Sequence, residues 1–164
     1  MNNWRNNHTI VKDIGLTLLS EGKTIRIKAH GYSMYPCIKP GSMLLIEPLN
    51  IKGMPVNGEI IAIRRETGLI VHRLSKILSK NNVTSYIARG DSNAYADNPV
   101  KIDMIAGRIV RAETTGENPV PADIRINTKP NYFYNRIRVI FILIKKKIQL
   151  TAEKAKKAQS MQRK

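Results

Sequence analysis

The sequence predicts a mainly β protein built around a compact, mostly antiparallel β-domain. Two observations support this class. Five or six short segments are apolar or alternate between apolar and polar residues, and Gly, Pro or Asn residues separate them. Short strands joined by tight turns form antiparallel sheets, whereas parallel strands need long crossovers. The expected strands are residues 24–29, 43–46, 59–64, 69–73, 83–88 and 105–111.

The first two expected strands differ in pattern. Residues 24–29 (TIRIKA) alternate apolar and polar side chains, as a half-buried strand does. Residues 43–46 (MLLI) form a short apolar run that follows Pro40-Gly41 and ends before Pro48. Both patterns are typical of strands in a small β-domain.

The next segments are preceded by turn signals. Residues 59–64 (EIIAIR) follow Asn57-Gly58, and residues 69–73 (LIVHR) follow Thr67-Gly68, so together they predict a hairpin. Residues 83–88 (VTSYIA) come after Asn81-Asn82, and the segment IAGRIVR closes the series.

Helices are expected on both sides of the β-domain. Residues 9–20 place most of their apolar side chains on one helical face and end at Glu21-Gly22. Residues 131–159 begin with an apolar part and continue with an Ala- and Lys-rich part. We therefore predict an N-terminal helical arm, a β-domain, a Pro- and Asn-rich linker and a basic amphipathic C-terminal helix or tail. The corresponding bounds are 1–22, 23–112, 113–130 and 131–164.

The net charge of +16 is concentrated near one end of the chain. Residues 136–164 contain ten basic residues and one acidic residue, which gives +9 of the +16. One interpretation is an amphipathic helix that lies on the surface of an anionic membrane. The other is a helix that packs on the β-domain and is followed by a basic end in solvent. The sequence favours neither interpretation. Nucleic acid is not an expected partner, because aromatic residues are not interleaved with the basic ones.

Cysteine usage and hydropathy indicate the compartment. Cys37 is the single cysteine, so an intrachain disulfide is excluded and a reducing compartment is the default. The first residues do not resemble a signal peptide. A membrane-spanning helix needs about 20 mostly apolar residues, whereas the run at residues 139–144 stops at three lysines. We expect a cytoplasmic protein without a membrane span, and at most a peripheral position at the inner membrane surface.

A candidate nucleophile lies in the stretch GYSMYPCIKPGS, residues 31–42. Ser33 stands there on backbone constrained by Gly and Pro, although a serine in such a position is more often a turn residue. A nucleophilic serine needs a base, and histidine suits that role because its pKa lies near neutrality. The chain offers His8, His30 and His72, of which His72 lies at the end of a predicted strand. Cys37 is a weaker candidate nucleophile, because no base is evident near it.

Two carboxylates follow in the stretch ARGDSNAYAD. Asp91 and Asp97 are six residues apart in a predicted loop, and either could orient a histidine base. Arg89-Gly90-Asp91 by itself is a common turn tripeptide. The residues taken singly therefore leave the choice between the two carboxylates open.

The combined pattern across residues 24–111 resembles the signal-peptidase/LexA-like serine peptidases of the S24/S26 type. The resemblance rests on GYSMYPCIKPGSMLLIEP, GEIIAIRR, IVHRL, YIARGDSNAYAD and AGRIV. Bacterial signal peptidases and LexA-type repressors have a lysine base at the position that matches His72. The histidine here resembles the archaeal and endoplasmic-reticulum branch of signal peptidases, which also carries a G-D-x-N loop with a second aspartate beyond it.

The resemblance implies the folded-over β-structure of that clan and a serine endopeptidase that needs no cofactor or metal. It implies Ser33 as nucleophile, His72 as base, Asp97 as the third member and Asp91 as a supporting carboxylate. Residues of the oxyanion and substrate loop would be Gly31, Met34 and Pro36. The sequence departs from the pattern of true signal peptidases in three ways. Gly31 occupies the position of their Ser or Thr, and Ser42 occupies a position where an Asp is usual. A segment that matches their membrane anchor is not expected.

The expected partner is a peptide or precursor protein, from which a leader is cleaved. One alternative is a LexA-like self-cleaving regulator. It would require a DNA-binding domain of about 50 residues ahead of the peptidase, whereas about 22 residues precede the first strand. Another alternative is a catalytically inactive module that binds peptides. The presence of Ser33, His72, Asp91 and Asp97 together argues against it.

Overall fold

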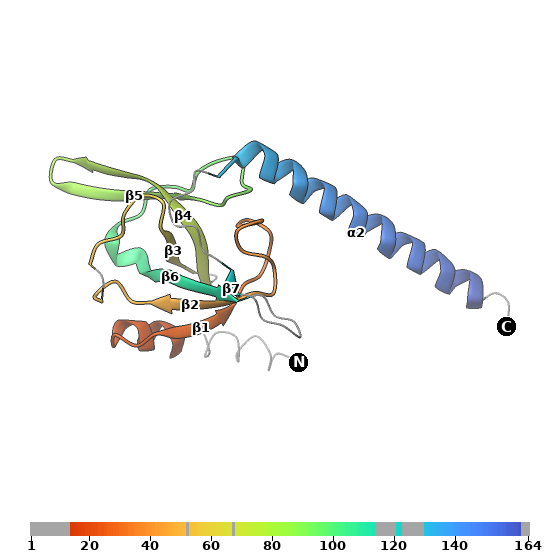
Figure 1. Cartoon of the computed structure of the whole chain (residues 1–164), viewed down its shortest axis with the longest axis horizontal. Coiled ribbons are helices and arrows are strands. Elements are labelled where there is room, and N and C mark those ends of the chain that lie inside the picture. The colour runs from red at the N-terminus through yellow and green to blue at the C-terminus, as the bar shows by residue number, and fades with distance from the viewer. Residues whose placement is uncertain (1–13, 52, 67, 114–120, 123–129, 162–164) are drawn as a thin grey trace.

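The computed structural model describes residues 14–51, 53–66, 68–113, 121–122 and 130–161. Six strands form an antiparallel sheet in the order β1-β2-β6-β3-β4-β5, and the short strand β7 pairs with β6. Figure 1 shows the sheet folded over on itself, with the long helix α2 leading away from it. The mainly antiparallel β class predicted from the sequence is confirmed. The strands are β1 Ile25–Lys28, β2 Met43–Glu47, β3 Ile60–Arg65, β4 Gly68–Lys80, β5 Val83–Arg89, β6 Ile105–Glu113 and β7 Pro121–Ala122.

Helices flank the sheet in the chain. Residues 14–20 are helical, and Leu19 packs into the core. A short 3-10 helix, η1 (Ile102–Met104), precedes β6, and α2 covers Tyr132–Met161. Residues 9–13 of the predicted N-terminal helix, most of the predicted linker and Thr67 lie outside the described residues, so the domain bounds stay a prediction. No helix in the described part of the chain is long and apolar enough to cross a bilayer.

Strand β3 lies between two hydrophobic clusters. Ile60 and Ala62 pack into a cluster with residues of β1, β2 and β6, whereas Ile61 and Ile63 pack into a second cluster with residues of β4 and β5. Successive side chains of a strand point to opposite faces, so the apolar run IIAI is buried on both. This arrangement follows from a sheet that folds over and covers its own central strand.

Strand β4 is longer than predicted. The sequence pattern ends the strand at Arg73, but β4 continues to Lys80 and pairs with β5 along that extension. Leu74 is still buried, but residues 75–80 are mostly polar and exposed, so the rest of the extension lacks the apolar signal by which a strand is predicted. Asn81 and Asn82 close the hairpin with φ angles of 49° and 60°, the conformation of a two-residue turn that Asn tolerates.

A buried ion pair fixes the loop after β5 to β4. The Nε and Nη2 groups of Arg73 each donate to the Asp91 carboxylate at 2.9 Å. The Arg73 Nη1 group also donates to the carbonyl oxygen of Gly58 at 2.9 Å. Burial lowers the pKa of Arg73, but the hydrogen bonds and charge of Asp91 outweigh burial and raise that pKa above its ordinary value. The guanidinium therefore stays charged inside the protein.

The same loop holds the segment that contains Ser33. The Ser92 hydroxyl donates to the carbonyl oxygens of Tyr32 and Ser33, at 2.6 and 3.1 Å, and the Ser92 N–H donates to the latter at 2.9 Å. A Cβ on Gly90 would lie 2.7 Å from the Ser33 carbonyl oxygen and 2.8 Å from the Asn93 side chain. Only glycine permits this close approach of the two loops.

We predict that Asp91→Asn lowers the free energy of unfolding by about 3–5 kcal/mol, because it leaves the buried Arg73 charge without its carboxylate. Urea denaturation followed by circular dichroism measures the change. The matched control is Asp103→Asn on η1, where the side chain is exposed and a change within about 0.5 kcal/mol is expected. Equal stability of the Asp91 variant and the wild type would contradict a structural role for the pair.

We predict that Gly90→Ala destabilises the protein by about 1–3 kcal/mol, because the new methyl group displaces the Ser33 backbone. Gly15→Ala is the control. A Cβ at residue 15 would have its nearest neighbour at 3.4 Å, and alanine favours a helix over glycine by roughly 0.5–1 kcal/mol. Thermal unfolding should therefore shift in opposite directions for the two variants, and a shift in the same direction would refute the close-approach argument.

Candidate active site

Ser33 lies on a loop between β1 and β2 whose apolar side chains anchor it to the core. Met34 and Ile38 are buried in the first hydrophobic cluster. Gly31 has a φ of 79°, a conformation that favours glycine. The side chain of Ser33, between these positions, is half-buried and reaches the pocket described below. The glycine and the buried apolar residues around Ser33 therefore hold its backbone in place and orient its side chain toward the pocket.

His72 lies on β4, where its side chain is buried, and Asp97 lies in the loop after β5. The Nδ1 group of His72 donates to the Oδ2 of Asp97 at 2.6 Å. Asp97 is fixed in turn, because its N–H donates to the carbonyl oxygen of Ala88 at the end of β5, at 2.8 Å. A carboxylate bound at Nδ1 sets the tautomer of the ring and leaves Nε2 to accept a proton.

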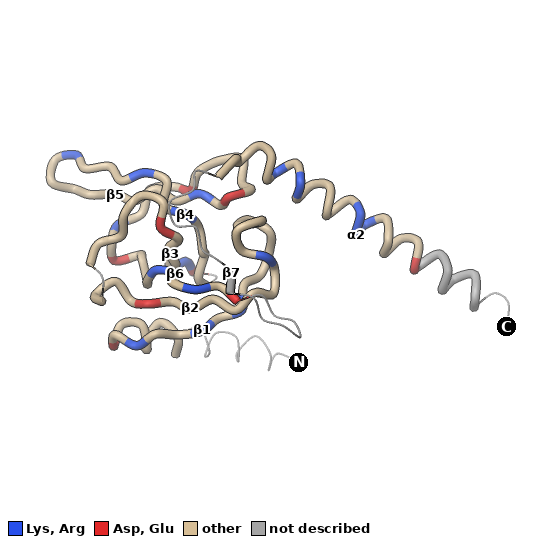
Figure 2. The backbone as a smooth tube through the Cα atoms, viewed as in Figure 1, with Lys and Arg blue, Asp and Glu red and all other residues tan. Residues whose placement is uncertain are grey.

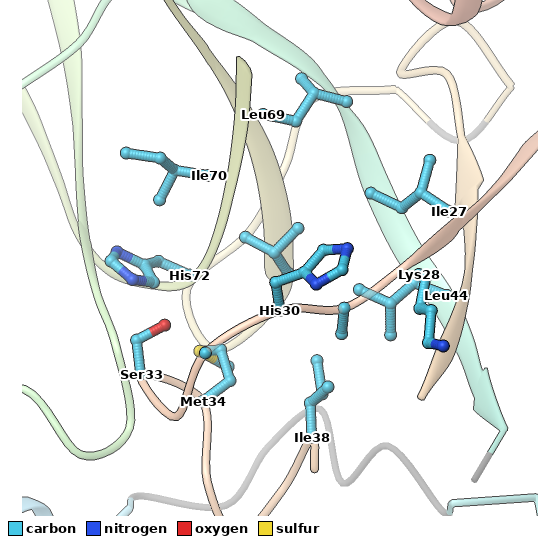
Figure 3. Close-up of a pocket in the computed structure, with 13 residues that line it drawn as sticks. Ile27, Lys28, His30, Ser33, Met34, Ile38, Leu44, Leu69, Ile70 and His72 are labelled. Atoms are coloured by element: carbon cyan, nitrogen blue, oxygen red, sulfur yellow. The ribbon is translucent and has the colours of Figure 1, made fainter. Parts of the chain in front are cut away.

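A pocket of about 310 Å³ opens between β1 and the first half of β4. Both Ser33 and His72 line it, and Figure 3 shows the Ser33 hydroxyl beside the His72 ring at one end. His30 also lines the pocket; it lies in the same β1–β2 loop three residues before Ser33, and its exposed ring points away from Ser33 and His72 (Figure 3). The remaining lining residues are Ile27, Lys28, Ala29, Gly31, Met34, Ile38, Leu44, Leu69, Ile70 and Val71.

The two candidate carboxylates have different partners. Asp97 contacts His72, whereas Asp91 is buried against Arg73 on the neighbouring position of β4. His8, the remaining histidine, lies outside the described residues. Pro36 belongs to the Ser33 loop but is not among the residues that line the pocket.

Cys37 lies near the buried ion pair rather than in the pocket. The Nη2 group of Arg73 donates to its Sγ at 3.4 Å. Burial raises the pKa of the Cys37 thiol, and the charge of Arg73 offsets this only in part. The thiol is therefore mainly protonated at neutral pH, which is unfavourable for a nucleophile.

Three residues that support the site were not identified from the sequence. Arg73 and Ser92 hold the Asp91 loop, and Asn135 of α2 donates from its buried side chain to the Asp91 carbonyl oxygen at 3.0 Å. Arg73 directly follows His72 in the sequence, and Ser92 lies within the stretch ARGDSNAYAD. The motifs that identified the candidate residues therefore also contained these two. Asn135 had no local signal, because its partner lies 44 residues away.

Within the described residues, His, Cys, Asp and Glu side chains do not form a group of three or more that could hold a metal ion. A search of curated proteins finds no match to this chain. The model of the Peptidase S24-like family matches residues 5–110. This match spans more than half of the 164 residues and includes Ser33, His72, Asp91 and Asp97. The chain therefore belongs to the Peptidase S24-like family.

Proposed function

We propose that the chain is a serine endopeptidase in which Ser33 is the nucleophile, His72 the general base and Asp97 the carboxylate that orients His72. One observation carries this proposal. Ser33 and His72 meet at one end of a pocket, and Asp97 holds the Nδ1 group of the same histidine at 2.6 Å. Family membership supports a serine peptidase at the coarser level.

In the proposed reaction, His72 removes the proton from the Ser33 hydroxyl as Oγ attacks the carbonyl carbon of a peptide bond. The C–N bond then breaks, and His72 gives the proton to the leaving amine. Water hydrolyses the resulting acyl-enzyme by the same two proton transfers and frees the serine. Asp97 stabilises the charged imidazole at both stages without taking its proton.

The developing oxyanion needs hydrogen-bond donors. Gly31 has no side chain to contribute, so backbone N–H groups of the Ser33 loop, including that of Ser33, would act as donors. A single donor of this kind is worth about 10²–10³ in rate. The rigidity of the loop, held by Ser92 and by buried Met34, favours donors that are already in position before the reaction.

The substrate is proposed to lie as an extended strand between β1 and β4. Strand β1 is at one end of the strand order, and β4 pairs with β5 only from Arg73 onward. Both strands therefore offer backbone groups toward the pocket, where a peptide can add main-chain hydrogen bonds. The apolar lining, which includes Ile27, Ala29 and Met34, suits small apolar side chains. A leader or precursor peptide in the cytoplasm would meet these requirements.

We predict that a serine-directed acylating probe with a short peptide forms one adduct per chain, and that Ser33→Ala abolishes it. His72→Ala and Asp97→Asn should slow adduct formation by about 10²–10⁴-fold, because each removes an oriented base. Intact-mass spectrometry over time measures the rates. Ser79→Ala, on the exposed end of β4, is the matched serine control and should label like the wild type.

His30→Ala tests the other histidine in the pocket and should retain the adduct. Loss of labelling in this variant, with labelling retained in His72→Ala, would assign the base to His30 instead. A wild type that binds the peptide but never forms an adduct would favour the inactive peptide-binding module. A self-cleaving regulator would show loss of mass from the chain itself.

The single cysteine gives a second prediction about the nucleophile. Because the pKa of Cys37 is raised in the folded protein, less thiolate is present at a given pH. The rate of alkylation by iodoacetamide should therefore reach half its maximum at a higher pH in the folded chain than in the same chain unfolded in urea. A midpoint below that of the unfolded chain would reopen Cys37 as a nucleophile.

A further inference from the structure

Helix α2 has one side that contacts the active-site loops. Asn135 bonds to the Asp91 carbonyl oxygen, Arg138 donates to the Tyr35 hydroxyl at 3.4 Å, and the ammonium of Lys146 lies 5.3 Å from the centre of the Tyr32 ring. Residues 135, 138 and 146 fall on one side of a helix with 3.6 residues per turn. This side is already occupied by contacts within the protein.

The other side of α2 carries exposed apolar side chains at helical spacing. We call these residues the apolar stripe, and they are Phe133, Ile137, Ile140, Phe141, Ile144 and Ile148. Their exposed fractions range from 41% to 76%. The stripe extends over residues 133–148, about 22 Å of helix. Soluble monomers seldom expose so many large apolar side chains together, so the stripe needs an occupant.

The charges around the stripe identify the class of occupant. Among residues 132–161, eight side chains are basic and Glu153 is the one acid. In Figure 2, the charged residues coloured on the first half of α2 are blue. A second copy of α2 would bring lysines against lysines at the edges of the stripe, which destabilises a helix pair. An anionic lipid surface instead offers an apolar layer for the stripe and negative headgroups for the basic flanks.

We propose that α2 lies in the plane of an anionic bilayer surface, with the apolar stripe inserted at the level of the acyl chains and the basic residues against the headgroups. The helix does not cross the bilayer, because lysines interrupt its apolar part at residues 145–147. The side that bears Asn135 faces away from the lipid and keeps its contacts with the domain. This proposal does not depend on the peptidase assignment.

Vesicle flotation of the full chain tests the proposal. We expect binding to vesicles of phosphatidylglycerol and phosphatidylcholine in equal parts, and weak or no binding to phosphatidylcholine alone. Ile144→Glu should weaken binding by on the order of tenfold or more, because it places a charge in the stripe. Gln149→Glu adds the same charge five residues along, outside the stripe, and should retain most of the binding.

Phe141→Ser provides a second variant, which removes apolar area from the stripe without adding charge and should also weaken binding. Circular dichroism checks that each variant keeps its helix, as expected for exposed positions. Absence of binding to the phosphatidylglycerol vesicles would overturn the proposal. So would a wild-type dimer in sedimentation that Ile144→Glu dissociates, because the stripe would then be an interface between copies.

Discussion

The buried ion pair between Arg73 and Asp91 is the contact on which the geometry of the site depends. Both side chains are almost fully buried, and removing two charges from water costs several kcal/mol per ion. The two bonds between them, and the bond from Arg73 to the Gly58 carbonyl oxygen, offset that cost. The residues on both sides of Asp91 then contact the Ser33 backbone, so this pair sets the position of the Ser33 loop relative to β4.

The neighbouring positions 72 and 73 give β4 two different functions. Successive side chains of a strand point to opposite faces, so His72 faces the pocket and Arg73 faces the opposite side. The loop after β5 supplies one carboxylate to each: Asp91 to Arg73 and Asp97 to His72. A hydrogen bond from the Asp97 N–H to the carbonyl oxygen of Ala88 holds this loop against the end of β5. Of the two aspartates six residues apart, Asp91 therefore pairs with a buried arginine and Asp97 orients the His72 ring.

Local patterns predicted the strands well, because turn residues and apolar runs act over a few positions. They failed at the end of β4, where residues 75–80 are mostly exposed and pair with β5 while burying little of either face. The motifs singled out Ser33, His72 and the two aspartates as candidates, but the partner of each aspartate followed only from the distances. Asn135 was missed because a buried side-chain bond to a distant carbonyl leaves no periodic trace in the sequence.

Helix α2 connects the site to the surface of the molecule. Its first turns are fixed by the buried bond from Asn135 and by Arg89, which lies 3.6 Å above the centre of the Tyr132 ring. Rotation of the helix about its axis would break both contacts, because each residue advances 100° around a helix. The direction of the apolar stripe relative to Ser33 is therefore fixed. Any surface that binds the stripe would hold the pocket between β1 and β4 in one orientation, which restricts the direction from which a peptide can enter it.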